Sequence, residues 1–231
     1  MQINHAGSAT TKEITGEEIV SASAVMHPRG KEMPRELTKE DIKGIVNDFK
    51  NAAKRVKDAG FDAVEIHSAH GYLLNQFYSP ITNKRTDEYG GDVLGRIKIH
   101  LEVIKAVREA VGEDFPVLLR LGACDYMEDG NTVEDAKIAA KEFEKVGIDI
   151  LDISGGLNGY IIPGNTNQGY FKDVTKEIKK VISIPVILTG GITKVEAAEE
   201  LIKENYADLI GVGRAIYKDS SWAKTAIESL K

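Results

Sequence analysis

Short apolar segments alternate with amphipathic ones along most of the chain, and this alternation limits the fold more than any other feature. We expect strands at 2–5, 61–67, 116–121, 148–153, 184–188 and 207–211. Apolar residues at helical spacing, with capping residues at the ends, predict helices at 38–59, 94–111, 132–146, 171–182, 194–204 and 220–230. Near-continuous apolar strands are typical of parallel sheets. The order therefore predicts an α/β protein.

Chemically useful residues lie at or just past the carboxyl ends of different expected strands. They are His67, Arg120, Ser154, Gly190 and Gly213. A TIM barrel places its site at this end of all its strands, whereas a doubly wound sheet concentrates it at one switch point. The pattern favours a (β/α)8 barrel. Because about six strands are expected, we predict an incomplete barrel that lacks its first two β/α units and forms one domain over 1–231.

Composition excludes several classes of protein. The net charge of −6 argues against nucleic acid as a partner. The single cysteine, Cys124, excludes an intramolecular disulfide framework and a cysteine-cluster metal site, and we expect it to be inert. No run of 18 apolar residues and no secretory signal is present, so we expect no membrane partner and a cytoplasmic location.

Two glycine-containing loops follow the last two expected strands. They are 189–192, with Gly190 and Gly191, and 211–214, with Gly213 and Arg214. Glycines expose backbone N–H groups to an anion, and arginine adds a bidentate cation. Barrel enzymes often bind phosphate between the loops after their last two strands. The loops therefore predict a phosphate-bearing ligand, such as FMN or a sugar phosphate, although glycines can also serve only to turn the chain.

A cluster of ring side chains follows the strand expected at 61–67. His67 and His70 could bind a metal ion with Glu65, hydrogen-bond one substrate oxygen, or be structural. Tyr72 is a candidate proton donor. Arg120 interrupts an apolar strand, so it needs either an acidic partner in the core or an anionic ligand, and its place near the strand end favours the ligand.

Other polar residues carry weaker predictions. We expect His27 and His100 to lie at the surface or in loops, and we assign no role to Asp149 or Asp152. The mixed charges of 83–91 suggest a loop that forms internal salt bridges and braces the face that carries the site.

The chain resembles the old yellow enzyme family, and is most similar to its bacterial NADH:flavin oxidoreductase / NADH oxidase branch. The resemblance runs from Gln2 to about Trp222 and is carried by the segments 2–7, 61–73, 76–80 and 83–91 together with the two glycine loops. It implies an FMN-dependent barrel that passes hydride from NADH or NADPH through flavin N5 to an activated alkene. The implied substrates are small α,β-unsaturated carbonyl or nitro compounds.

The resemblance also implies a role for each matching residue. Gln2 would bind the flavin pyrimidine edge, and Arg120 would stabilise the reduced flavin. His67 and His70 would hold the substrate oxygen, which leaves no metal site, and Tyr72 would protonate the substrate. The flavin phosphate would be held by Gly190, Gly191, Gly213 and Arg214.

Members of the family have two β/α units before the glutamine-bearing strand, so the resemblance implies that this chain is truncated at its N-terminus. An open barrel exposes unpaired strand edges, and we therefore expect a homo-oligomer or a complementing chain. Two alternatives remain open. One is a barrel remnant that does not retain flavin or needs assembly to do so, and the other is a lyase or isomerase acting on a phosphate-bearing ligand.

Overall fold

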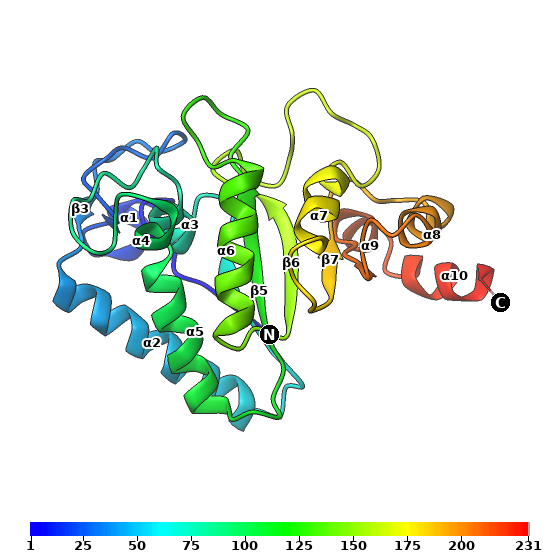
Figure 1. The fold of residues 1–231 in the computed structure, drawn as a ribbon, viewed down its shortest axis with the longest axis horizontal. Coiled ribbons are helices and arrows are strands. Elements are labelled where there is room, and N and C mark those ends of the chain that lie inside the picture. Colours follow the sequence, from blue (N-terminus) through cyan, green and yellow to red (C-terminus); the bar gives the residue numbers. More distant parts are fainter. Residues whose placement is uncertain (231) are drawn as a thin grey trace.

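The computed structural model describes residues 1–230, and its main feature is a six-stranded parallel sheet (Figure 1). The strands are β1 (Gln2–Ile3), β4 (Val64–Ser68), β5 (Val117–Cys124), β6 (Ile150–Gly155), β7 (Val186–Leu188) and β8 (Leu209–Ile210). They lie side by side in chain order with no reversal. A doubly wound sheet reverses its order at a switch point, so this order is that of a partial TIM barrel.

Helices connect successive strands and pack against one another along the outer face of the sheet (Figure 1). The long ones are α2 (Lys39–Asp58), α5 (Lys98–Val111), α6 (Val133–Lys145), α7 (Lys172–Lys179), α8 (Val195–Lys203) and α10 (Trp222–Ser229). Thr38 and Thr132 begin α2 and α6 with capping boxes, in which each threonine hydroxyl accepts from the backbone N–H three residues later.

The two faces of the sheet are buried to different degrees. The face covered by helices carries side chains that are 0% exposed, namely Val64, Ile66, Leu119, Leu121, Leu151, Ile153, Val186 and Leu188. The opposite face carries Glu65, His67, Arg120 and Asp152 and is only partly buried. Within the described residues β1 and β8 do not pair, so the barrel is open and its interior face is accessible.

The segment between β1 and α2 is held by the loop at 83–91. It contains α1 (Lys12–Thr15) and a small parallel pair, β2 (Val20–Ser21) with β3 (Arg35–Glu36). Arg85 donates from Nη1 to the carbonyl oxygens of Ala22 and Leu37, and its remaining donors bind the carboxylate of Asp87. The loop therefore contains the expected internal salt bridge, between Arg85 and Asp87.

One prediction about a single residue is wrong. His100 is 0% exposed and lies within a helix, although we expected it at the surface or in a loop, whereas His27 does lie in a loop but is only 2% exposed. His100 lies on α5 and hydrogen-bonds Ser68 on β4, which satisfies one polar ring atom inside the core. The sequence patterns also did not predict α1, α3 (Leu73–Tyr78) or α9 (Arg214–Lys218), and the helix expected at 94–111 is divided into α4 (Val93–Arg96) and α5. The residues of α3 are all buried, so this helix has no polar face from which to recognise it.

Candidate active site

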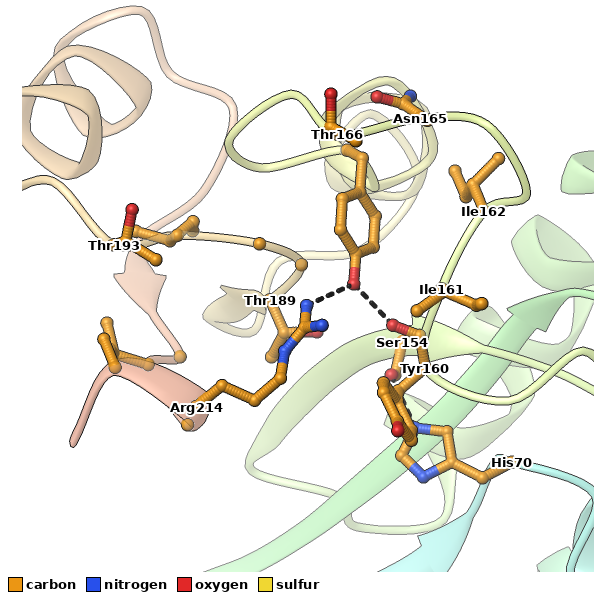
Figure 2. Close-up of a pocket in the computed structure, with 18 of the residues that line it drawn as sticks. His70, Ser154, Tyr160, Ile161, Ile162, Asn165, Thr166, Thr189, Thr193 and Arg214 are labelled. Carbon is orange, nitrogen blue, oxygen red and sulfur yellow. Dashed lines mark hydrogen bonds between the residues drawn. The ribbon is translucent and has the colours of Figure 1, made fainter. Parts of the chain in front are cut away.

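A cavity of about 860 Å³ opens at the carboxyl ends of the strands. Its walls come from the end of β6 and from the loops after β4, β6, β7 and β8 (Figure 2). Six of the predicted site residues line it, which are His70, Arg120, Gly190, Gly191, Gly213 and Arg214. The structure thus brings together residues that lie far apart in the sequence.

The glycine loop after β7 is closely packed at one end of the cavity. Gly190 has a φ of +111°, and a Cβ built there would lie 2.8 Å from the ring of Tyr170. Gly191 has a φ of +68° and meets the same ring at the same distance. Only glycine adopts this backbone while leaving room for the tyrosine.

Arg214 projects into the same end of the cavity (Figure 2). Its Nη2 donates to the hydroxyl of Tyr170 at 3.1 Å, and its guanidinium lies 5.5 Å from the centre of the Tyr160 ring. Within residues 1–230 no carboxylate pairs with Arg214. This arginine therefore keeps its positive charge available to an anionic ligand.

Arg120 supplies the second cation of the cavity. Its Nε lies 3.2 Å from Oδ2 of Asp152, its register partner on β6. Burial raises the pKa of Asp152 to about 7, although the positive charge of Arg120 acts in the opposite direction. Arg120 thus has an acidic partner, which was one of the two options left open by its place in an apolar strand. It also lines the cavity, where the anionic ligand of the other option would bind.

Asp152 is a site residue that sequence reasoning missed. A signal was present, because β5 and β6 are neighbouring apolar strands that each carry one charged residue at matching positions. Oδ1 of Asp152 and Nε of Arg120 are buried and make no hydrogen bond. Such atoms are costly unless a ligand or water completes the site.

His67, His70 and Tyr72 form one ring cluster. The His67 ring lies 4.9 Å from that of His70 and 5.2 Å from that of Tyr72, both edge-on. Burial and, to a smaller extent, the positive charge of Arg120 together lower the pKa of His67 to about 4 and that of His70 to about 3. The two imidazoles are therefore neutral at pH 7.

The protonated nitrogen of His67 follows from its contacts. Nδ1 accepts a hydrogen bond from the backbone N–H of Ala69 at 3.2 Å. A neutral imidazole that accepts at Nδ1 carries its proton on Nε2. His67 is thus a hydrogen-bond donor through Nε2, as binding of a substrate oxygen requires.

Three predicted site residues lie outside the cavity wall. His67 belongs to the ring cluster behind His70, and Tyr72 lines a separate, smaller cavity. Gln2 is exposed on β1 and donates from Nε2 to Glu65 at 2.5 Å, since the two residues are register partners. Within residues 1–230, no three His, Cys, Asp or Glu side chains are grouped so that they could hold a metal ion.

The cavity fits FMN in its chemistry. Backbone N–H groups of the glycine loops and the unpaired Arg214 suit a phosphate, and Arg120 suits a ring system that gains negative charge on reduction. A volume of about 860 Å³ lies within the usual range for cofactor sites, roughly 300–1,000 Å³.

The fold and the site together define a partial TIM barrel whose cavity has glycine loops and Arg214 at one end and Arg120 with His70 at the other. The chain belongs to the NADH:flavin oxidoreductase / NADH oxidase family, whose model matches residues 1–231. The expected membership of the old yellow enzyme family, with FMN as the flavin and NADH or NADPH as the reductant, is confirmed at the level of the family.

Known relatives match almost the whole chain. An NADH oxidase of Thermoanaerobacter brockii is 44% identical over 99% of the chain and 36% of the relative. An NADPH dehydrogenase of Listeria welshimeri is 43% identical over 100% of the chain and 66% of the relative. The solved structure of an old yellow enzyme homologue from Zymomonas mobilis superposes with a TM-score of 0.84 at 25% identity, covering 100% of the chain and 66% of that structure.

The chain spans between about a third and two thirds of the length of these relatives. Within the described residues, no helix combines the length and apolar character needed to cross a membrane.

Proposed function

We propose that the chain is part of an FMN-dependent NAD(P)H oxidoreductase that reduces activated alkenes, with small α,β-unsaturated carbonyl or nitro compounds as substrates. One observation carries the proposal. A single cavity holds an unpaired arginine among glycine loops at one end and, at the other, Arg120 beside the neutral imidazole of His70, whose ring contacts that of His67. NADH and NADPH are metabolites of the cytoplasm, and this supports a cytoplasmic location for the chain.

The residues of the cavity would share the work of holding the cofactor. Arg214 and the backbone of Gly190, Gly191 and Gly213 would bind the phosphate, and Arg120 would stabilise negative charge on the reduced ring system. The proposed role of Gln2 at the pyrimidine edge requires its side chain to leave Glu65. When bound, FMN supplies the redox chemistry by taking hydride from NADH or NADPH and passing it to the substrate β-carbon.

The ring cluster would act on the substrate. Nε2–H of His67, together with His70, would donate hydrogen bonds to the carbonyl or nitro oxygen and draw electrons from the double bond. Tyr72 would then deliver a proton to the α-carbon. Because both imidazoles are neutral, they polarise the substrate without competing with Tyr72 as acids.

We also propose that further polypeptide closes the open sheet, either a second copy or a complementing chain. The unpaired edges at β1 and β8 and the partly buried interior face support this proposal. They also favour a second candidate function, a barrel that retains flavin only once assembled. A lyase or isomerase has less support, since the cavity wall contains no carboxylate pair, and its one lysine, Lys218, lies on α9 and not at a strand end.

Visible absorption tests the proposal. The purified chain is mixed with FMN, freed of excess by gel filtration and scanned, then treated with NADH or NADPH and with cyclohexenone. We expect retained flavin that bleaches with the reductant and regains its colour with the enone. Gel filtration of the same sample gives the mass, and a mass above that of one chain supports assembly.

A matched pair of ligands and variants locates the phosphate. Arg214→Gln is expected to weaken FMN binding at least tenfold while leaving riboflavin binding unchanged, because riboflavin lacks the phosphate. Lys54→Gln on α2 is the control, since Lys54 pairs only with Asp58 on the surface. A chain that binds neither flavin at any assembly state would contradict the catalytic proposal.

A further inference from the structure

A second cavity, of about 360 Å³, lies beside the ring cluster. Tyr72 belongs both to the ring cluster and to the wall of this cavity. A molecule positioned at Tyr72 therefore has a place for a further substituent. The wall opposite Tyr72 comes from the segment between β1 and α2, chiefly Ser8, Thr10, Thr11, His27, Arg29 and Lys31.

The charge of this wall is of one sign. Arg29 and Lys31 line it, and no aspartate or glutamate does. Within residues 1–230 neither cation pairs with a carboxylate, although the chain has 36 acidic residues and a net charge of −6. Most other arginines of the chain form ion pairs, as Arg35, Arg85, Arg96 and Arg108 do. Two unpaired cations over one cavity favour an anionic occupant.

One buried hydroxyl group in the same wall has no partner. Ser8 is 1% exposed, and its Oγ makes no hydrogen bond. Its backbone N–H is already satisfied by Gln76, so only the hydroxyl remains free. A buried hydroxyl without a partner is costly, and an anion at this place would accept its hydrogen bond.

The basic wall is held in a fixed position relative to Tyr72. Arg29 donates from Nη2 to the backbone oxygen of His70 at 2.7 Å. His27 packs over Gly71, where a Cβ would lie 2.4 Å from its Nε2. Both contacts join the 27–31 segment to the 70–72 loop. An anion bound by Arg29 and Lys31 would therefore lie at a fixed distance from Tyr72, the proposed proton donor.

We propose that this cavity is an anion subsite, which takes a carboxylate or phosphate ester carried by the alkene substrate whose double bond lies at the ring cluster. The inference rests on the proposed function and narrows its substrates to acidic alkenes. Arg29 and Lys31 would bind the anionic group, and the hydroxyl of Ser8 would complete its hydrogen bonds. Neutral alkenes of the same shape would reach the ring cluster without this contribution.

Calorimetric titration of the chain with two probes tests the subsite. Cinnamate carries the anion, and cinnamamide is its neutral counterpart of nearly the same shape. We expect cinnamate to bind at least tenfold more tightly than cinnamamide, and the difference to shrink as salt is raised. Lys31→Gln and Arg29→Gln should each weaken cinnamate severalfold to tenfold and leave cinnamamide unchanged, whereas the control Lys54→Gln should alter neither.

Two results would overturn the proposal. One is equal affinity for the two probes. The other is a loss of NADPH affinity in Lys31→Gln and Arg29→Gln with cinnamate affinity unchanged, which would assign the cavity to the reductant. Flavin retention is measured on the same samples. A chain that prefers cinnamate but binds no FMN supports the subsite and contradicts the proposed function. A chain that binds FMN but does not prefer cinnamate supports the proposed function and contradicts the subsite.

Discussion

Nε2 of His70 lies 2.7 Å from Oγ of Ser154, although the two residues are 84 positions apart in the chain. Nη2 of Arg120 also donates to this hydroxyl oxygen, at 3.5 Å. His70 has a φ of +60°, a conformation that few residues other than glycine adopt. The hydrogen bond to Ser154 therefore joins a strained loop residue to the regular strand β6 and links it to the cation of the cavity.

Ser154→Ala is expected to lower the free energy of unfolding by about 1 kcal/mol, because it leaves the partly buried Nε2 of His70 without its partner. Urea unfolding at pH 7 measures the loss. The double variant Ser154→Ala with His70→Gln should cost less than the sum of the two single variants. Additive costs would show that the two side chains do not interact.

Stability should depend on pH through Asp152. Its folded pKa of about 7 exceeds the ordinary value of 3.8, so between these values the folded chain holds a proton that the unfolded chain has released. The contribution of Asp152 to stability is present below about pH 4 and is lost as pH rises through about 7. Asp152→Asn removes this dependence. We expect the variant to gain stability relative to the parent between pH 5 and pH 8, on the order of a few kcal/mol.

Urea unfolding of Asp152→Asn and of the parent protein at pH 5 and at pH 8 provides the comparison. Asp41→Asn is a useful contrast, because hydrogen bonds from Arg35 and Thr38 lower the pKa of Asp41 to about 2. Its contribution is already complete at pH 5, so no change is expected between pH 5 and pH 8. A constant difference between Asp152→Asn and the parent would contradict the raised pKa.

The two histidines of the ring cluster should change stability with pH in the direction opposite to Asp152. The unfolded chain protonates them near pH 6.5, whereas the folded chain keeps them neutral down to about pH 4 for His67 and about pH 3 for His70. Their contribution to stability is thus complete above pH 6.5 and is lost as pH falls towards 3. Imidazole NMR signals should show no titration of either ring between pH 7 and pH 5, with the proton of His67 on Nε2. Titration near pH 6.5 would contradict this assignment.

Alanine substitutions of glycines in the two loops should differ in how much they destabilise the chain. Gly190→Ala places a Cβ 2.8 Å from the Tyr170 ring on a backbone with φ +111° and should destabilise the chain by about 1–3 kcal/mol. Gly213→Ala is the matched control, since no atom lies within 4 Å of the new Cβ and its φ is −112°. We expect it to cost less than about 1 kcal/mol. Thermal unfolding of the two variants compares them directly, and equal losses would show that the packing against Tyr170 is not tight.

Features that depend on neighbouring residues were predictable from the sequence. Helical spacing and Thr38 located α2, and apolar runs located β4 to β8. The glycine loops after β7 and β8 indicated one end of the cavity, because glycines and an arginine after successive parallel strands meet at one edge of the sheet. The family was predictable from the resemblance, because the motifs on which the resemblance depends are contiguous segments of the chain.

Features that depend on packing between distant segments were not predictable. Nothing in the sequence around His100 shows that α5 packs this ring against Phe143, 43 positions later, so it looked like a surface residue. Asp152 had no apparent role until the register of β5 and β6 placed it beside Arg120. The second cavity likewise exists only because the 27–31 segment folds back onto the 70–72 loop.

The sequence by itself therefore determined the order of strands and helices, the parallel sheet and the family, because local propensity and hydrophobic periodicity act over a few residues. Only the tertiary structure decided which charges are neutralised, which imidazoles stay neutral and which cations remain free for ligands. These properties follow from burial and from distances of a few ångströms between side chains that strand register and loop packing bring together.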